Sequence, residues 1–485
     1  MGEIEVDDFS EWKVQPTSKM AGYGLGYIII NYLLLYGLAQ IDFFYRNVMG
    51  LDPGLILAAG LILGFWAMIN DPVIGYLTDR PFKWTRKRGL RKPWIMIATV
   101  PIFIFFILIF TAPLGAEQMT IFLYLIIVTC IFDVFFSLYN DHLYGGYTNQ
   151  FLTKFERRKS FMLIVVMGFI ILIGMVVLQS AIVGIIGELK QESYIINAIA
   201  MVIMMGIFSI FVFKSISESE EMKTMFVEKY NSAEKTSFVK VAKTALGTKN
   251  FRVSLLGYTL QVTSITLWNA AQLYFFVDVY GLNYELSTIP LVLSIIGAIG
   301  SIPFWSNFTR RGTFKRTYWV AFLLHGLSFI PFTFLILVTS SMMSLIMHSV
   351  FLFISNIFYA GELTMLQPVA SDTYDEVALK LGKRNDAAFV GIRNFFFRIA
   401  FLIQYFVFWL VLVVITDYIP HEFGTEAIDV VQPLQAKFGI LVMGALLPAI
   451  LLIIMSQIFR KYYTLEGKEK DELVKGLKEA GLFIA

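Results

Sequence analysis

The sequence predicts an all-α membrane protein with twelve transmembrane helices in two halves of six. Of its 485 residues, 57% are hydrophobic and only 15% are charged, and the mean hydropathy is +0.69, far from the values of soluble globular proteins. Apolar runs of about 20 residues, the length of helix that crosses the hydrocarbon core of a bilayer, follow one another along the chain. Polar turns separate these runs, and the pattern therefore indicates a multi-pass membrane protein.

The first half is expected at 20–213, after a polar N-terminal tail at 1–19. Its six apolar runs cover about 20–45, 53–78, 93–111, 119–147, 161–186 and 195–213. The tail is acidic, unlike a cleavable signal peptide, so we expect the internal helices to direct insertion into the membrane. A charged segment at 214–250 then divides the chain near its middle, and it is long enough for a surface helix and a linker.

The second half is expected at 251–463. Its six apolar runs cover about 253–279, 288–304, 317–338, 342–369, 387–415 and 438–459. The tail at 464–485 predicts at most a short amphipathic helix that is solvated or rests on lipid headgroups. Two blocks of six helices around a polar linker indicate two related halves, which is the plan of many secondary carriers.

Positive charge falls in alternate loops and predicts the orientation of the chain. The loop after the second helix holds six basic residues, which are Lys83, Arg86, Lys87, Arg88, Arg91 and Lys92. The loops on the opposite side are almost free of Lys and Arg. Because positive loops stay in the cytoplasm, we expect both termini to be cytoplasmic and the protein to lie in the plasma membrane.

Several classes of function find no support in the sequence. The chain has one cysteine, Cys130, so it can form no intrachain disulfide and no cysteine-based metal site. His325 and His348 are isolated in apolar runs and are expected to be packed side chains rather than metal ligands. We find no phosphate-binding loop, nucleophile elbow, HExxH pattern or sign of nucleic-acid binding. The protein is therefore not expected to be an enzyme or to hold a cofactor, and the energy for transport would come from an ion gradient.

Polar residues on the second helix form the first candidate site. Asp71, Gly75 and Asp79 are spaced four apart and share one face, with Asn70 beside them. Asp71 lies deep enough to bind a cation or a substrate, although it could also be a structural partner of another charge. Asp79 stands at the helix end next to Arg80 and is expected to pair with a basic loop or helix end as a gate latch.

The fourth helix carries a second polar stripe. Asp133, Asn140 and Asp141 lie about two turns apart on one face, and Tyr144 and Tyr147 extend it. Aromatic rings and hydroxyls near carboxylates suit a sugar, which offers apolar faces as well as hydroxyl groups. The alternative is that this stripe simply packs helices together.

The eleventh helix contains two arginines, Arg393 and Arg398, among phenylalanines. An unpaired guanidinium is costly in a bilayer, so at least one arginine should meet an intramembrane acid. Asp71 and Asp141 are the candidates. Such a pair would bridge the two halves of the chain.

Seven short motifs together resemble one known family. They are MAGYGLG at 20–26, FYRNVMGL at 44–51, INDPVIGYLTDR at 69–80, RKPW at 91–94, FERR at 155–158, SDTYDE at 371–376 and GKR at 382–384. These segments resemble the glycoside–pentoside–hexuronide:cation symporters, the branch of the major facilitator superfamily that contains the bacterial melibiose permease. The resemblance spans both halves in the expected order.

The resemblance implies a carrier with the major facilitator fold and alternating access, in which solute and cation share a central cavity. It places Asp71 and Asn70 at the family's cation site, and Arg398 at the family's helix-eleven lysine. Either Asn140 or Asp141 falls on the family's helix-four acid, and the local spacing leaves both open.

Three positions depart from the family pattern. The second helix-two acid aligns with Ala67, the helix-one sugar-binding acid with Asn31, and the helix-five arginine with Val165. One helix-two carboxylate makes a poor sodium cage, because sodium prefers several oxygen ligands. The departures therefore favour proton coupling through Asp71 or Asp141, or loss of coupling, and they weaken the expectation of a sugar.

Together these observations predict a secondary active transporter that moves a small organic solute, with a sugar or glycoside as the first choice, coupled to a proton or a sodium ion. The alternatives are a carrier of lysolipid or other lipid, or an uncoupled or non-transport membrane protein with a carrier-like fold. A monomer is expected. The predicted residues are Asn31, Asn140, Asp141, Tyr144 and Arg398 for substrate binding, Asn70 and Asp71 for cation coupling, and Asp79, Arg80 and Arg384 for gating.

Overall fold

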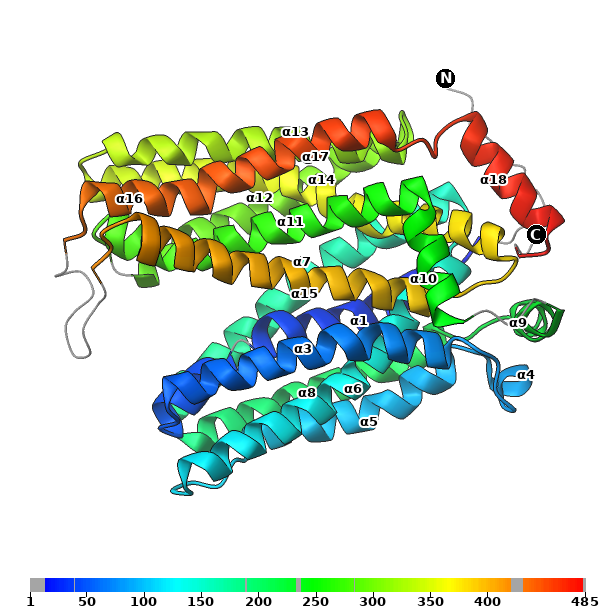
Figure 1. Cartoon of the computed structure of the whole chain (residues 1–485), viewed down its shortest axis with the longest axis horizontal. Coiled ribbons are helices and arrows are strands. Elements are labelled where there is room, and N and C mark those ends of the chain that lie inside the picture. Colours follow the sequence, from blue (N-terminus) through cyan, green and yellow to red (C-terminus); the bar gives the residue numbers. More distant parts are fainter. Residues whose placement is uncertain are drawn as a thin grey trace. The chain divides into compact units, whose positions relative to one another are not determined.

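The computed structural model of the chain describes residues 14–38, 40–187, 190–232, 237–282, 284–419 and 431–482. These residues form helices and contain no β-strand (Figure 1). Ten helices within them are long and apolar enough to cross a membrane. The first and seventh predicted spans are also helical but are not among these ten. The first changes to π-helical turns at Leu33–Gly37, and the seventh carries more polar residues along its length.

The first half of the chain supplies six of the principal helices. They are α1 (Thr17–Tyr32), α3 (Pro53–Thr78), α5 (Lys92–Ile109), α6 (Gln118–Gln150), α7 (Lys154–Ile186) and α8 (Gln191–Ser215). Shorter elements are α2 (Gln40–Phe43), a π-helical turn at Phe44–Val48 and α4 (Thr85–Arg88). The central segment that was predicted as a surface helix and linker contains α9 (Glu220–Ser232) and α10 (Phe238–Gly247).

The second half supplies the remaining helices. They are α11 (Lys249–Tyr274), α12 (Thr288–Arg310), α13 (Phe314–Phe329), α14 (Ser341–Leu381), α15 (Asp386–Trp409), α16 (Leu434–Leu441), α17 (Leu447–Tyr462) and α18 (Lys468–Glu479). Irregular helical turns at Ile330–Leu337, Leu410–Ile415 and Val442–Leu446 continue α13 and α15 and join α16 to α17.

Helix α3 shows how local sequence sets an element that positions the site. Asp52 caps its first turn, because Oδ1 accepts hydrogen bonds from the backbone N–H groups of Gly54 at 2.8 Å and Leu55 at 3.3 Å. Pro72 lies inside the same helix and cannot donate to the carbonyl four residues earlier. The helical ladder is therefore interrupted directly beside Asp71.

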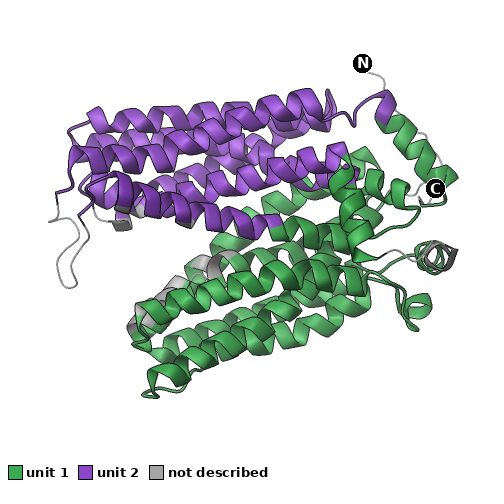
Figure 2. Ribbon diagram, in the orientation of Figure 1, with its two compact units in different colours: residues 1–248, 374–395, 470–485 green, residues 249–373, 396–469 purple. Residues whose placement is uncertain are grey.

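The chain divides into two compact units, which we describe separately (Figure 2). Unit 1 comprises 1–248, 374–395 and 470–485, and unit 2 comprises 249–373 and 396–469. The end of α14, the start of α15 and the C-terminal segment thus pack with the N-terminal helices. The domain boundaries predicted from the sequence stay a prediction.

The C-terminal segment packs apolar residues on unit 1, while many polar residues of α18 are exposed. Leu473 and Leu477 of α18 are buried, and the backbone oxygen of Leu482 accepts a hydrogen bond from Arg384 Nε at 3.0 Å. The predicted short amphipathic helix is thus present as α18, and its apolar side covers part of unit 1.

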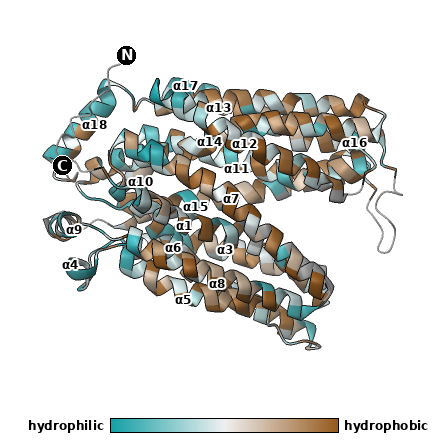
Figure 3. Ribbon diagram, turned by 180° about the vertical axis from the view of Figure 1, so that it is seen from behind, coloured by the Kyte–Doolittle hydropathy of each residue, from teal (hydrophilic) through white to brown (hydrophobic). Residues whose placement is uncertain are grey.

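Side chains on the long helices fit a lipid environment. Large apolar residues such as Phe65, Ile69 and Ile203 are exposed. Figure 3 shows hydrophobic residues along the long helices and hydrophilic ones on α4, α9 and α18. In unit 1 the opposite pattern holds inside, since the C-terminal part of α6 buries a row of polar residues from Asp133 to Gln150. Polar groups buried within a membrane bundle mark this region as the candidate site.

Candidate functional site

Four polar side chains of α3 and α6 form a buried cluster in unit 1, which we call the α3–α6 cluster. Its members are Asn70, Asp71, Asp133 and Ser137. Ser137 Oγ donates a hydrogen bond to Asp71 Oδ1, and Asp71 is only 2% exposed. Asn70 Nδ2 donates to Asp133 Oδ2 and to Ser137 Oγ, both at 3.2 Å. The cluster offers carboxylate, amide and hydroxyl oxygens, which can bind a proton or a hard cation.

The sequence positions these four groups through simple helical spacing. Asp133 and Ser137 are four residues apart, so they lie on the same face of α6. They meet Asn70 and Asp71, which are adjacent on α3 just before Pro72. Among the residues that the structure describes, no group of three or more His, Cys, Asp or Glu side chains could hold a metal ion.

Asp141 lies on α6 two turns beyond Asp133 and is fully buried. Its Oδ1 accepts a hydrogen bond from Asn394 Nδ2 at 3.1 Å and a longer one from Asn140 Nδ2 at 3.4 Å. Its Oδ2 accepts no hydrogen bond from any part of the chain that the structure describes. The first turns of α15 therefore supply the principal donor to this carboxyl group.

An aromatic group lies beside Asp141. The guanidinium of Arg393 stands 4.9 Å from the ring centre of Tyr144, and that ring lies 4.4 Å from the ring of Tyr27 on α1. Asn31, one turn further along α1, donates its Nδ2 to the backbone oxygen of Tyr27 at 2.8 Å. The structure thus places the predicted residue Tyr144 in this aromatic group, and the predicted residue Asn31 bonds to the backbone of Tyr27 on the same helix. Tyr27 was not predicted, although its spacing from Asn31 could have indicated it.

The two arginines of α15 lie in different units. Arg393 belongs to unit 1 and is close enough to Asp141 to act on it electrostatically. Arg398 belongs to unit 2, where its guanidinium lies 5.9 Å from the ring centre of Phe397. The prediction that at least one of the two arginines pairs with Asp71 or Asp141 stays a prediction.

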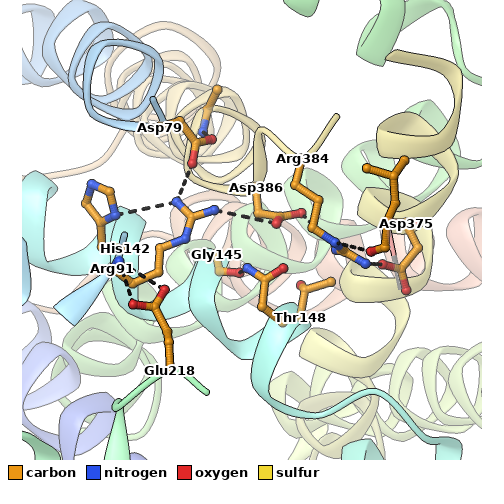
Figure 4. A network of polar contacts seen from close by, with 12 residues as sticks. Asp79, Arg91, His142, Gly145, Thr148, Glu218, Asp375, Arg384 and Asp386 are labelled. Atoms are coloured by element: carbon orange, nitrogen blue, oxygen red, sulfur yellow. Dashed lines mark hydrogen bonds and ion pairs between the residues drawn. The ribbon is translucent and has the colours of Figure 1, made fainter. Parts of the chain in front are cut away.

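A second polar network lies at the end of unit 1 that carries the basic loops (Figure 4). We call it the basic-end network, and its members are Asp79, Arg91, Arg157, Glu218, Asp375, Arg384 and Asp386. Arg91 Nη1 forms an ion pair with Asp79 Oδ1, and Arg91 Nη2 lies 3.5 Å from Asp386 Oδ2. The backbone N–H of Arg91 donates to Glu218 Oε1 at 3.1 Å. Arg91 therefore joins α3 to the start of α15 and to the segment before α9.

Asp375 is the centre of the other part of this network. Its Oδ2 lies 2.6 Å from Arg157 Nη2, and its Oδ1 lies 2.8 Å from Arg384 Nη2. Arg384 Nη1 is also 3.5 Å from Asp386 Oδ1. The side chains of all four residues are at most 5% exposed. These pairs fix the end of α14 and the start of α15 against α7.

The structure gives the predicted gating residues different surroundings. Asp79 pairs with Arg91 and also accepts a hydrogen bond from the backbone N–H of Ala388 at 3.1 Å. Arg80 is exposed and donates from Nε to the backbone oxygen of Leu77 at 2.9 Å. Arg384 is buried within the network. The gating role of all three stays a prediction, and no sequence pattern indicated Asp386 or Glu218 as members of the network.

Two acids of the network change protonation near neutral pH. Burial raises the pKa of Asp79 to about 6, although Arg91 opposes this shift. Burial also raises the pKa of Glu218 to about 7, against the hydrogen bond from the backbone of Arg91. Burial opposes the charge of Arg91, but Asp79, Asp386 and Glu218 together raise its pKa. The arginine therefore stays charged while Asp79 and Glu218 respond to pH.

Comparison with known proteins places these features in context. Residues 19–466 match the family model described as MFS/sugar transport protein. The inner membrane symporter YicJ of Escherichia coli (strain K12) is 30% identical over 106 residues, which are 21% of this chain and 21% of that protein. The uncharacterized symporter sll1374 of Synechocystis sp. is 31% identical over 138 residues, 26% of this chain and 24% of that protein. The alignments thus span less than a third of either relative.

Two solved structures share the fold along almost their whole length. A bacterial homologue of the iron transporter ferroportin in an outward-facing state has a TM-score of 0.60 and 12% identity, covering 92% of this chain and 98% of that one. The proton:xylose symporter XylE bound to 6-bromo-6-deoxy-D-glucose has a TM-score of 0.57 and 12% identity, covering 95% of this chain and 98% of that one. At this identity the likeness shows the fold alone.

Proposed function

The chain belongs to the MFS/sugar transport protein family, and we propose that it moves a small organic solute by alternating access, driven by a cation gradient. Membership of this family makes it a multi-pass membrane transporter rather than an enzyme. The family match and the shared fold confirm the predicted all-α major facilitator fold, and the family match supports the predicted transport role. We further propose that it works as a monomer in the plasma membrane, with both termini in the cytoplasm.

The buried carboxylates of the α3–α6 cluster carry this proposal. Asp71 is 2% exposed and Asp133 is 5% exposed, and both lie inside helices that are long and apolar enough to cross a membrane. Acids at such depth are costly, and they are typical of ion and proton pathways. A bound cation or proton would offset this cost. The cluster is therefore our candidate for the coupling site, with Asn70 and Ser137 as further oxygen donors.

The aromatic group beside Asp141 is our candidate for the solute site. Tyr27 and Tyr144 offer ring faces for the apolar side of a sugar, while Asn31, Asn140 and Arg393 offer hydrogen-bond donors for its hydroxyl groups. The description of the family model as MFS/sugar transport protein supports a sugar or glycoside as the solute class.

The basic-end network is our candidate for the gate. Arg91 holds the start of α15 to α3, and Asp375 holds the end of α14 to α7. A solute could pass between these segments only if the ion pairs separate, as alternating access requires. Asp79 and Arg384 are within the network, and Arg80 lies at its exposed edge.

Binding measurements test the solute class. We expect isothermal titration of the purified protein with a panel of sugars and glycosides to give saturable binding that is weakened in Tyr144→Ala. The matched control is Tyr124→Ala, a partly buried tyrosine nearer the other end of the same helix, whose hydroxyl donates to the backbone oxygen of Leu108 at 2.8 Å. Saturable binding of lysolipids, with no sugar bound by either variant or by the wild type, would reject the sugar proposal and favour a lipid carrier.

A further inference from the structure

Unit 2 contains three side-chain amides within the seventh and eleventh predicted membrane spans, and we call them the unit-2 amides. They are Asn269 and Gln272 of α11 and Gln404 of α15. Asn269 is exposed, and the other two are partly exposed. Among the residues that the structure describes, Asn269 and Gln404 make no side-chain hydrogen bond. Gln272 donates only a long one, from Nε2 to the backbone oxygen of Trp268 at 3.4 Å.

The two amides of α11 lie on a face that is turned away from the core of unit 2. Helical spacing places four residues on this face, which are Val262, Ile265, Asn269 and Gln272. All four are at least partly exposed, whereas Trp268 beside them is buried. An amide without a hydrogen-bond partner is costly in hydrocarbon, and α11 is not among the ten helices apolar enough to cross a membrane by composition. This face is therefore suited to water rather than to lipid.

Aromatic contacts bring the amide of α15 to the same region. Phe397, Gln404 and Phe408 are seven and four residues apart, so they lie on one face of α15. The ring of Phe397 stacks on the ring of Tyr258 of α11, with 6.2 Å between the ring centres. The ring centre of Phe408 lies 5.7 Å from that of Tyr274, also on α11. Gln404 lies between these two contacts on α15, just as the two amides of α11 lie between the two tyrosines.

The chemistry of these groups suits a neutral solute with several hydroxyl groups. A side-chain amide has two N–H donors and an oxygen acceptor, so it can bond to a hydroxyl group in either direction. The rings of Tyr258 and Phe397 offer apolar faces for the C–H groups of such a solute. Because amides do not ionise at neutral pH, the unit-2 amides are suited to contact with a solute rather than to binding a proton.

We infer that the unit-2 amides line the water-filled path of the solute and form hydrogen bonds with the hydroxyl groups of a neutral sugar or glycoside. They give unit 2 a solute-binding surface of its own, in addition to the aromatic group beside Asp141 in unit 1. This inference rests on the proposed function, since it names residues of the second half that contact the solute. The sequence patterns indicated none of the three.

Cysteine labelling tests whether this face meets water or lipid. Asn269→Cys or Gln404→Cys is introduced into the full-length protein after Cys130→Ala has removed the single cysteine. The protein is placed in lipid vesicles, and a charged, water-soluble methanethiosulfonate reagent is added on both sides. The reagent reacts with the thiolate, which forms in water and not in hydrocarbon.

The matched control is Ile296→Cys, because Ile296 is 59% exposed on α12, a helix of unit 2 that is apolar enough to cross a membrane. We expect both test positions to be labelled at least about tenfold faster than this control. A rate for Asn269→Cys equal to that for Ile296→Cys would overturn the inference. A saturating sugar should slow the labelling of Asn269→Cys, and a sugar that binds but leaves this rate unchanged would overturn the contact with the solute.

A second variant measures the hydrogen bond directly. Asn269→Leu keeps a side chain that a membrane helix accepts, and it should weaken sugar binding about two- to tenfold, the effect of losing one neutral hydrogen bond. The matched control is Asn307→Leu of α12, whose amide oxygen accepts a hydrogen bond from Arg310 Nη2 at 2.9 Å, and it should keep the wild-type affinity. Wild-type affinity in Asn269→Leu would overturn the inference.

Failure of the proposed function is recognised separately. Rapid labelling of Asn269→Cys, with no sugar bound by the wild type, would reject the sugar as solute while the water-lined face remains. Saturable sugar binding with labelling as slow as in Ile296→Cys would keep the solute class and reject the unit-2 amides as part of its path.

Discussion

Replacing Gly75 with alanine should loosen the start of α15 in unit 1. The added Cβ would lie 2.5 Å from the backbone oxygen and 2.9 Å from the backbone carbon of Ala387. Both atoms belong to a helical backbone, so they cannot move aside as the end of a flexible side chain can. The two helices must separate by several tenths of an ångström, and the close backbone contact between Gly75 and Ala387 is lost.

The magnitude follows from two opposing effects. Alanine is favoured over glycine inside a helix by about 1 kcal/mol, because glycine loses more backbone entropy. Overpacking in a well-packed interior costs about 1–3 kcal/mol, and a backbone neighbour places Gly75 near the upper end. We therefore expect a net loss of about 1–2 kcal/mol in the closed packing of residues 386–391, which corresponds to a protection factor lower by about tenfold.

Gly64→Ala is the matched control on the same helix, because a Cβ there would meet no atom within 4 Å. It should leave the protection of residues 386–391 unchanged. Hydrogen exchange at one pH, with thermal unfolding measured in parallel, separates a local loss of packing from general instability. Equal protection in Gly75→Ala and Gly64→Ala would refute the reasoning.

Three further predictions test other parts of the account. The folded-state pKa of Glu218, about 7, lies above its ordinary value of 4.5, so this carboxyl stabilises the fold fully below pH 4.5 and loses that contribution as the pH rises through 7. Glu218→Gln should therefore raise the free energy of unfolding at about pH 8 by up to about 3 kcal/mol, and the unfolding temperature should rise with it. At about pH 5 both quantities should change little. Asp375→Asn should destabilise the protein by about 3–5 kcal/mol in denaturation experiments, since two buried arginines lose their charged partner. Its control, Glu376→Gln, breaks a partly exposed pair with Lys380 and should cost less than about 1 kcal/mol. Asp71→Asn should abolish gradient-driven uptake in proteoliposomes but keep solute exchange, and unchanged accumulation would count against Asp71 as the coupling residue.

The helices could be predicted well where apolar residues continue to their ends. The run predicted at 53–78 coincides with α3 (Pro53–Thr78), because a capping Asp52 precedes it and Asp79 follows it. The prediction was too short where helices continue into polar sequence. The run at 342–369 belongs to α14, which extends to Leu381 because its last turns are buried in unit 1 and paired there. Apolar periodicity cannot reveal a helix end that is covered by other protein segments.

The candidate site could be predicted only as far as one helix carries it. Spacing alone placed Asp133 and Asp141 on one stripe of α6. The partner of Asp79 could not be chosen, since the loop after α3 offers six basic residues and only the fold brings Arg91 to it. The place of Asp386 beside Arg91, 295 residues away in the chain, depends in the same way on tertiary packing.

Solute accumulation in proteoliposomes tests the central claim most directly. Vesicles that contain the purified protein are given a labelled sugar identified by the binding panel, with an inward proton gradient, an inward sodium gradient or no gradient. The account predicts accumulation above the external concentration with a gradient, and uptake only to equilibrium when an ionophore abolishes it. Identical uptake with and without both gradients would contradict the claim that this chain is a cation-coupled carrier.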